Sequence, residues 1–162
     1  MYHHLQKILK AKFGGDATLI GDEGGFAPPC DCRSGLELVM EAIEAAGYAG
    51  KCTVGLDVAA SEFKVKSSPA GEGAVYDLGM WDSEEQKLSG AELMDFYSGL
   101  IRDFPIVTIE DAFDEDDWPN WSEFVGKIGT DVQVHRRPWA RSVPADADRL
   151  SPRRLTIGPP LL

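Results

Sequence analysis

CTVGLDV (residues 52–58) and IVTIED (residues 106–111) are the two stretches that decide the fold. Both are short and rich in β-branched residues, which is typical of strands buried in a parallel sheet. Each has a carboxylate at or just past its C-terminal end, Asp57 in the first and Glu110 in the second. Open α/β sheets and (β/α) barrels keep their chemistry at that end of the strands.

Asp57 and Glu110 are therefore the candidate metal ligands. Neighbouring strands lie about 4.8 Å apart, so two carboxylates that leave the same end of adjacent strands can share one divalent cation. The competing interpretation is that an acid at a strand end caps a helix or is a solvated loop residue. Because two such acids lie on successive strands of an acidic chain, the metal-ligand interpretation and the competing one are about equally favoured.

The composition fits one ordinary domain. The chain has 162 residues and a formal net charge of −11, which argues against a surface for nucleic acid or anionic membranes. An eight-stranded (β/α) barrel typically needs about 250 residues, so half a barrel is the most that we expect. We expect neither a membrane span nor a signal peptide. Cys30, Cys32 and Cys52 lack the spacing of a redox or zinc motif and are expected to be free thiols.

The elements around the two strands follow from local patterns. Apolar residues at helical spacing predict a helix over residues 1–13. Ser34 and Ser89 are each followed three residues later by glutamate, a capping box that predicts the start of a helix at each serine. A small hairpin is expected around residues 75–78, and a third parallel strand over residues 132–134.

Several polar and aromatic residues favour structural interpretations. Residues 111–117 form an acidic run. This run resembles a calcium loop only by charge, because it lacks the alternating acids and central glycine of that motif. We interpret it as a solvated face. Tyr97, Trp118 and Trp121 are interpreted as core or loop-anchoring aromatics, and the adjacent His3 and His4 diverge on a helix, so they are poor joint ligands. The acidic run comprises Asp111, Asp114, Glu115, Asp116 and Asp117.

The last 28 residues, 135–162, differ in composition from the rest. They contain six arginines, five prolines and two aspartates, so they are basic in an otherwise acidic chain. No helical or strand period persists there for more than a few residues. We predict a disordered Arg/Pro-rich tail over residues 135–162, following a folded part over residues 1–134.

The chain resembles the enolases, the glycolytic phosphopyruvate hydratases. The resemblance rests on three ordered motifs, and it extends from Met1 to about Val134. It implies an α/β fold that is a partial TIM-type (β/α) barrel, a fragment of the C-terminal enolase domain. The motifs are GDEGGFAP at residues 21–28, GLDVAASEF at 55–63, and IEDAF at 109–113 together with DDW at 116–118.

The resemblance also implies roles for individual residues. Enolases reversibly dehydrate 2-phosphoglycerate to phosphoenolpyruvate with Mg²⁺, using a lysine base and a glutamate that protonates the departing hydroxyl. By position, Glu23 matches that general acid, and Asp57 and Glu110 match two of the three carboxylate metal ligands. Glu110 also lies beside the substrate in the family. The family further implies a cytoplasmic homodimer, and the acidic charge described above leads us to expect no nucleic-acid or membrane partner.

The chain departs from the enolase pattern at the third metal ligand. The family has an aspartate just beyond the strand that matches residues 132–134, whereas here His135, Arg136 and Arg137 follow. The lysine base and the phosphate-binding residues belong to later barrel strands in the family. We therefore expect this chain alone to lack dehydratase activity. The alternative is a non-catalytic acidic fragment or weak divalent-cation-binding module, which Mg²⁺ titration of Asp57→Ala and Glu110→Ala would distinguish.

Overall fold

The computed structural model describes residues 1–21, 24–65, 73–79 and 86–136. They fall into two compact units, one within residues 1–54 and the other beginning at Gly55. Glu23 and residues 137–162 lie outside the described residues. The predicted tail therefore stays a prediction over residues 137–162, whereas its first two residues are described and His135 ends a strand.

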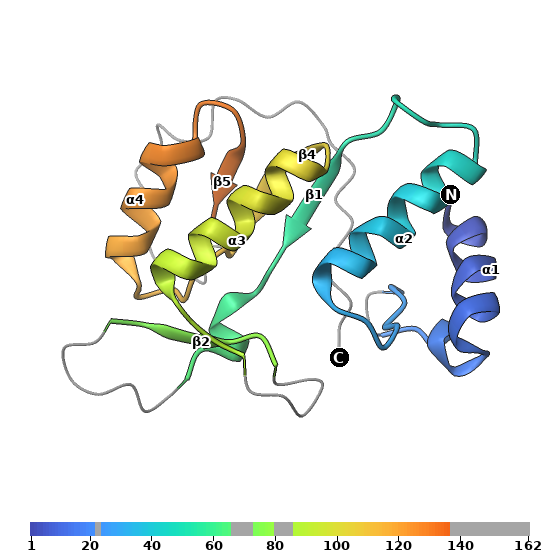
Figure 1. Cartoon of the computed structure of the whole chain (residues 1–162), viewed down its shortest axis with the longest axis horizontal. Helices are drawn as coiled ribbons and strands as arrows, with labels where there is room; N and C mark the ends of the chain where they lie inside the picture. Colours follow the sequence, from blue (N-terminus) through green and yellow to red (C-terminus); the bar gives the residue numbers. More distant parts are fainter. Residues whose placement is uncertain (22–23, 66–72, 80–85, 137–162) are drawn as a thin grey trace. The chain divides into compact units, whose positions relative to one another are not determined.

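The first unit is built from two helices, α1 (Tyr2–Phe13) and α2 (Cys32–Ala45), with the short 3-10 helix η1 (Asp16–Thr18) between them. The predicted N-terminal helix is confirmed. Its apolar face supplies Leu9, which is fully buried and packs in one cluster with Phe26 and Leu38. α1 and α2 lie side by side (Figure 1), and the unit thus has a small apolar core of its own.

The predicted start of α2 is wrong by three residues. Asp31, rather than Ser34, is the N-cap, and its Oδ1 accepts a 2.8 Å hydrogen bond from the Ser34 N–H. The Ser34 hydroxyl also donates to Asp31, at 3.1 Å. Aspartate and serine are both good N-cap residues, and here the carboxylate accepts hydrogen bonds from both the backbone and the side chain of the serine.

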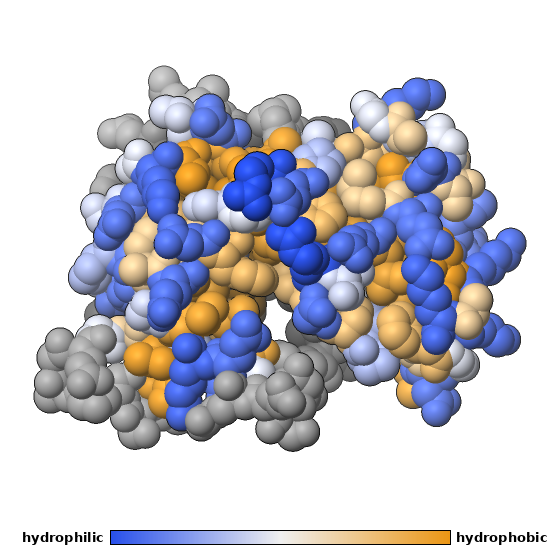
Figure 2. All heavy atoms as spheres, viewed as in Figure 1, coloured by the Kyte–Doolittle hydropathy of each residue, from blue (hydrophilic) through white to orange (hydrophobic). Residues whose placement is uncertain are grey.

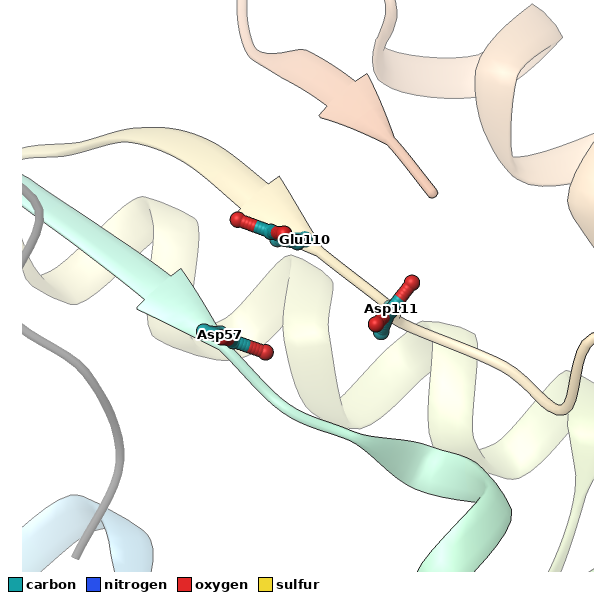
Figure 3. Close-up of side chains that lie close together, drawn as sticks. All are labelled: Asp57, Glu110 and Asp111. Atoms are coloured by element: carbon teal, nitrogen blue, oxygen red, sulfur yellow. The ribbon is translucent and has the colours of Figure 1, made fainter. Parts of the chain in front are cut away.

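The second unit carries an open three-stranded sheet with the order β1-β4-β5. Its strands are β1 (Val54–Asp57), β4 (Ile106–Glu110) and β5 (Gln133–His135). β4 and β5 are parallel, and β1 and β4 run in the same direction (Figure 3). The third parallel strand is confirmed, one residue later than predicted. The described residues thus form part of a barrel-type sheet.

Two helices pack beside this sheet. α3 (Gly90–Asp103) packs against β4 and against α4 (Trp118–Ile128) (Figure 1). The capping box predicted at Ser89 is present, because Glu92 Oε2 accepts a 2.8 Å bond from the Ser89 N–H and the Ser89 side chain accepts from the Glu92 N–H.

The predicted hairpin is also present. β2 (Val75–Asp77) pairs antiparallel with β3 (Lys87–Ser89), immediately before α3. It follows the short 3-10 helix η2 (Ala60–Phe63). The hairpin is not part of the three-stranded sheet, and it brings Tyr76 into the core, where its side chain is fully buried.

Phe113 is the centre of the core of the second unit. Its ring contacts four aromatic rings at centroid distances between 5.4 and 6.0 Å. Aromatic pairs in such edge-on arrangements add to the free energy gained from burial alone. Phe113 follows Glu110 by three residues, so this cluster fixes the chain just beyond the candidate ligands. The four rings are those of Tyr76, Tyr97, Trp121 and Phe124.

The predictions for the three singled-out aromatics therefore differ in outcome. Tyr97 and Trp121 are buried, as expected. Trp118 is 61% exposed, so the interpretation as a core residue is wrong. It lies at the first turn of α4, and the Arg136 guanidinium covers its ring at 5.0 Å from the centroid. The ring thus makes a cation–π contact with Arg136 at the surface.

The surface shows polar and apolar side chains interspersed over the visible face of the described residues (Figure 2). Among those residues, no helix has the length and apolar character needed to cross a membrane. Cys30, Cys32 and Cys52 are free thiols, as predicted. Cys32 is exposed, and Cys30 and Cys52 are partly buried.

Candidate metal centre

Asp57 is the last residue of β1, and Glu110 is the last residue of β4. Backbone hydrogen bonds continue beyond both strand ends. The Val58 N–H donates to the Glu110 carbonyl at 2.9 Å, and the Ala60 N–H donates to the Asp111 carbonyl at 3.0 Å. These bonds hold the two strand ends level, so both carboxylates lie at the same edge of the sheet (Figure 3).

Three carboxylates meet at this edge. One oxygen from each of Asp57, Glu110 and Asp111 lies within 4.8 Å of the others. Asp57 and Glu110 are each only 9% exposed, and Asp111 is half-buried. Hard divalent cations such as Mg²⁺ and Ca²⁺ prefer oxygen ligands of this type. The donor set therefore fits a divalent metal, and it includes both residues that the sequence singled out.

Asp111 is the member that sequence reasoning missed, because it was assigned to a solvated acidic run. Its backbone is left-handed, with φ of 50°, and its N–H donates to the His135 carbonyl at 3.0 Å. Aspartate tolerates the left-handed conformation better than most residues. One Asp111 oxygen thereby lies within 4.8 Å of oxygens of both Asp57 and Glu110, although Asp111 directly follows Glu110 along the chain. The sequence did contain a signal for Asp111, because this acid directly follows Glu110, the acid at the end of a strand.

His135 lies beside Glu110. The two residues are register partners in the parallel pair β4 and β5. The His135 Nε2 atom is 3.0 Å from Glu110 Oε2, and its Nδ1 atom is 3.4 Å from the Thr108 hydroxyl oxygen. A ring nitrogen thus lies next to the carboxylates, at the end of the strand after which the enolase pattern has its third aspartate ligand.

Two arginines, Arg136 and Arg137, follow His135. The Arg136 guanidinium covers the Trp118 ring and donates a 2.8 Å hydrogen bond to the Glu115 carbonyl. The charged group of Arg136 is therefore bound to the β4–α4 loop and to the start of α4. Arg137 lies outside the described residues.

The loop that follows Glu110 is anchored from two helices. The Tyr97 hydroxyl of α3 donates to the Ala112 carbonyl at 2.8 Å, and the Trp121 indole N–H of α4 donates to the Asp114 carbonyl at 2.9 Å. Both bonds are buried, and a buried backbone carbonyl left without a donor is costly. The loop is thereby fixed on both sides of Phe113, next to the carboxylate cluster.

The prediction that residues 111–117 form a solvated face is wrong for Asp114 and Asp117. Each is only 8% exposed. Asp114 accepts a 2.6 Å hydrogen bond from the Lys64 ammonium and a 3.1 Å bond from the Asp116 N–H. Burial alone would raise the pKa of Asp114, but these bonds outweigh it and hold that pKa below its usual range. Partners far away in sequence make this burial tolerable.

Tyr76 links the hairpin to the same loop. Its hydroxyl donates to Asp117 Oδ2 at 2.7 Å and accepts a 3.0 Å bond from the Asp114 N–H. Asp117 also accepts hydrogen bonds of 2.9 and 2.7 Å from the Asn120 side-chain amide. Burial, followed by the hydrogen bond to Asp117, raises the pKa of Tyr76, so the hydroxyl stays protonated and keeps donating.

The third residue that the sequence assigned to the site is Glu23. It lies outside the described residues, so the structure does not bring it together with Asp57 and Glu110. Its role as a general acid stays a prediction.

Comparison with known proteins gives the family. The family model described as the enolase C-terminal TIM barrel domain matches residues 1–136. A protein named Enolase from Solanum lycopersicum is 46% identical over 138 residues, which cover 83% of this chain and 30% of the relative. Enolase 2 from Hevea brasiliensis has the same identity and coverage. The chain thus spans about 30% of the length of these curated relatives. Because the family model matches most of its length, the chain belongs to the enolase C-terminal TIM barrel domain family.

Proposed function

We propose that Asp57 and Glu110 bind Mg²⁺ in an enolase that reversibly dehydrates 2-phosphoglycerate to phosphoenolpyruvate in glycolysis. The observation that carries the proposal is the close approach of Asp57, Glu110 and Asp111 at the end of two neighbouring strands, in a member of the enolase family. Carboxylate oxygens suit Mg²⁺, a hard cation that is usually bound through one or two carboxylates, here Asp57 and Glu110.

The residues divide the chemistry between them. Mg²⁺, when bound, would offset the negative charge that develops on the substrate carboxylate as the adjacent proton passes to the lysine base, which in the family belongs to a later barrel strand. Asp57 and Glu110 hold the cation, and Glu110 also lies next to the substrate. Glu23 protonates the departing hydroxyl, because hydroxide is a poor leaving group without a proton donor.

The burial of the two ligands supports this assignment. Two carboxylates that are each 9% exposed repel each other in a site shielded from water, and a shared dication removes that repulsion. The anchored loop after Glu110 keeps the carboxylates close before a cation arrives, which lowers the entropy lost on binding. The family also supports a cytoplasmic homodimer as the working form.

Calorimetric titration of 2-phosphoglycerate into the full chain, with and without Mg²⁺, tests the proposal. We expect binding that requires Mg²⁺ and that Glu110→Gln abolishes. Glu115→Gln is the matched control, because Glu115 is an exposed acid five residues further along the same loop. Binding that is independent of Mg²⁺, or equally weakened by both substitutions, would contradict the proposal.

A non-catalytic cation-binding module is the second candidate. The observation that favours it is His135, which lies beside Glu110 where the enolase pattern has a third carboxylate. The binding of 2-phosphoglycerate distinguishes the two candidates, because a bare cation-binding module binds Mg²⁺ but not this substrate. In a coupled assay for phosphoenolpyruvate we expect no turnover by the 162-residue chain under either candidate, and robust product formation would exclude the second.

A further inference from the structure

We propose that the ion pair of Lys64 and Asp114 is a positioning pair for the metal centre. The pair ties the segment that follows Asp57 to the loop that follows Glu110, and it thereby holds these two ligands close enough to share a cation. The inference rests on the proposed function, because it concerns the cation assigned to those two carboxylates. All four residues lie in the second unit.

The segment after β1 and the loop after β4 are cross-linked at successive points. Closest to the ligands are the two backbone hydrogen bonds described above. Further along, the Glu115 N–H donates a 3.3 Å bond to the Ser61 hydroxyl oxygen. Lys64 directly follows η2, and its ammonium donates to Asp114 Oδ1 at 2.6 Å. The ion pair therefore closes the far end of a ring that contains both ligand-bearing strand ends.

The backbone beside each ligand needs such a closure. Ala59, just after Asp57, has φ of 49° and ψ of 46°, and Asp111, directly after Glu110, has φ of 50°. This left-handed conformation is unfavourable for residues other than glycine, and more so for alanine than for aspartate. It persists only where the surrounding structure holds it. The directions in which the chain leaves the two ligands are therefore set by contacts further along both segments.

Asp114 is a firm anchor for this purpose. Its N–H donates to the Tyr76 hydroxyl at 3.0 Å, and its carbonyl accepts the buried bond from the Trp121 indole. The Lys64 and Asp114 side chains are 33% and 11% exposed, so this pair is better shielded from water than a surface pair. The bond to Asp114 also raises the pKa of Lys64, so the ammonium is charged at neutral pH. Lys64 is thus tied to a residue that is fixed on three sides.

Positioning and charge alone predict different effects on Mg²⁺ binding. An ammonium repels a nearby cation, so through its charge alone the loss of Lys64 would strengthen Mg²⁺ binding. The loss of the Asp114 charge would weaken it, and the two effects would offset each other in a double variant. A positioning pair predicts that either loss weakens binding. The double variant then loses no more than one single variant, because the same contact is already gone.

Calorimetric titration of Mg²⁺ into the full chain compares the wild type with Lys64→Met, Asp114→Asn and the double variant. We expect each single substitution to weaken Mg²⁺ binding about three- to tenfold, and the double variant to match the more affected single variant. Lys64→Arg, which keeps a cation that can donate to Asp114, should retain most of the affinity. Lys127→Met is the matched control, because it removes a lysine whose 3.0 Å pair with Asp95 is exposed.

Circular dichroism at the titration temperature establishes that each variant is folded, and Lys64→Gln takes the place of Lys64→Met if the latter is not. Unchanged or tighter Mg²⁺ binding in the folded Lys64 variant, or additive losses in the double variant, would overturn the inference. If Asp57→Asn binds Mg²⁺ as the wild type does, the proposed function itself fails. A loss in Asp57→Asn without one in Lys64→Met rejects the positioning role alone, so the two failures are distinguishable.

Discussion

The backbone N–H of Val58 donates a 2.9 Å hydrogen bond to the carbonyl oxygen of Glu110. This bond joins the residue after Asp57 to the last residue of β4. It therefore fixes the end of β1 relative to the end of β4. Gly55 assists within β1, because a Cβ at that position would lie 2.8 Å from the Thr108 side chain. Asp57 and Glu110 are 53 residues apart in the sequence. Their close approach thus depends on the backbone pairing of the two strand ends and on the absence of a side chain at Gly55.

Asp111 is expected to contribute to cation binding without determining the fold. Asparagine tolerates its left-handed backbone, so Asp111→Asn should unfold at the same temperature as the wild type and bind Mg²⁺ several-fold more weakly. Asp111→Val should in addition lose about 1–2 kcal/mol of stability through backbone strain. Calorimetry and thermal unfolding measure the two effects. Asp116→Asn, in an exposed position, is the control, and an equal loss of affinity in both asparagine variants would contradict a specific role.

Tyr76→Phe should destabilise the protein by about 1–3 kcal/mol, because it leaves the buried Asp117 carboxylate and the Asp114 N–H without the hydroxyl. Tyr2→Phe removes a 3.1 Å bond from an exposed tyrosine to the Gly24 carbonyl and should cost much less. Urea unfolding of both variants provides the comparison. Equal effects would mean that the buried network around Asp117 does not stabilise the loop.

Gly90→Ala should be destabilising, although alanine is the better helix former. A Cβ at Gly90 would lie 2.0 Å from the Asn120 amide nitrogen, and Asn120 can move away only by giving up its bonds to Asp117. Gly126→Ala in α4 meets nothing within 4 Å and should stabilise the helix by about 0.5–1 kcal/mol. Thermal unfolding should shift in opposite directions for the two variants. A gain in stability from Gly90→Ala would show that Asn120 is not fixed.

The Lys64 and Asp114 pair predicts a defined pH dependence. The folded state lowers the pKa of Asp114 below its ordinary 3.8, so the pair stabilises the fold above that pH and the contribution is lost as the pH falls through the lowered pKa. Lys64→Met should therefore cost about 1–2 kcal/mol at neutral pH and progressively less below pH 3.8. Urea unfolding at several pH values measures the difference.

Lys12→Met is the control for that experiment. It removes the Lys12–Glu41 pair, whose side chains are 49% and 48% exposed, and exposed pairs contribute little. We expect a change below about 0.5 kcal/mol at every pH. A loss that is independent of pH in Lys64→Met would assign its effect to packing rather than to the ion pair.

The features that sequence reasoning predicted are those that local patterns encode. The capping box at Ser89 and the strand that ends at Glu110 depend on residues within a few positions. The start of α2 was misplaced because Asp31 and Ser34 satisfy the same local rule. Only the backbone conformation decides between them.

The features that were missed depend on distant partners. The burial of Asp114 requires Lys64, 50 residues away, and that of Asp117 requires Tyr76, 41 residues away. A run of acids without those partners would be solvated, which is the interpretation that local reasoning gives. Asp111 was missed for a related reason, because its direction is set by a backbone conformation that the sequence does not mark.

Titration of Mg²⁺ into the wild type, Asp57→Asn, Glu110→Gln and the control Asp116→Asn tests the central claim most directly. The isosteric substitutions keep the volume of each side chain and remove only the charge. We predict that each ligand substitution weakens Mg²⁺ binding at least about tenfold, while the control leaves it unchanged. Mg²⁺ affinity that is the same in all four proteins would contradict the claim that these two carboxylates form a metal site.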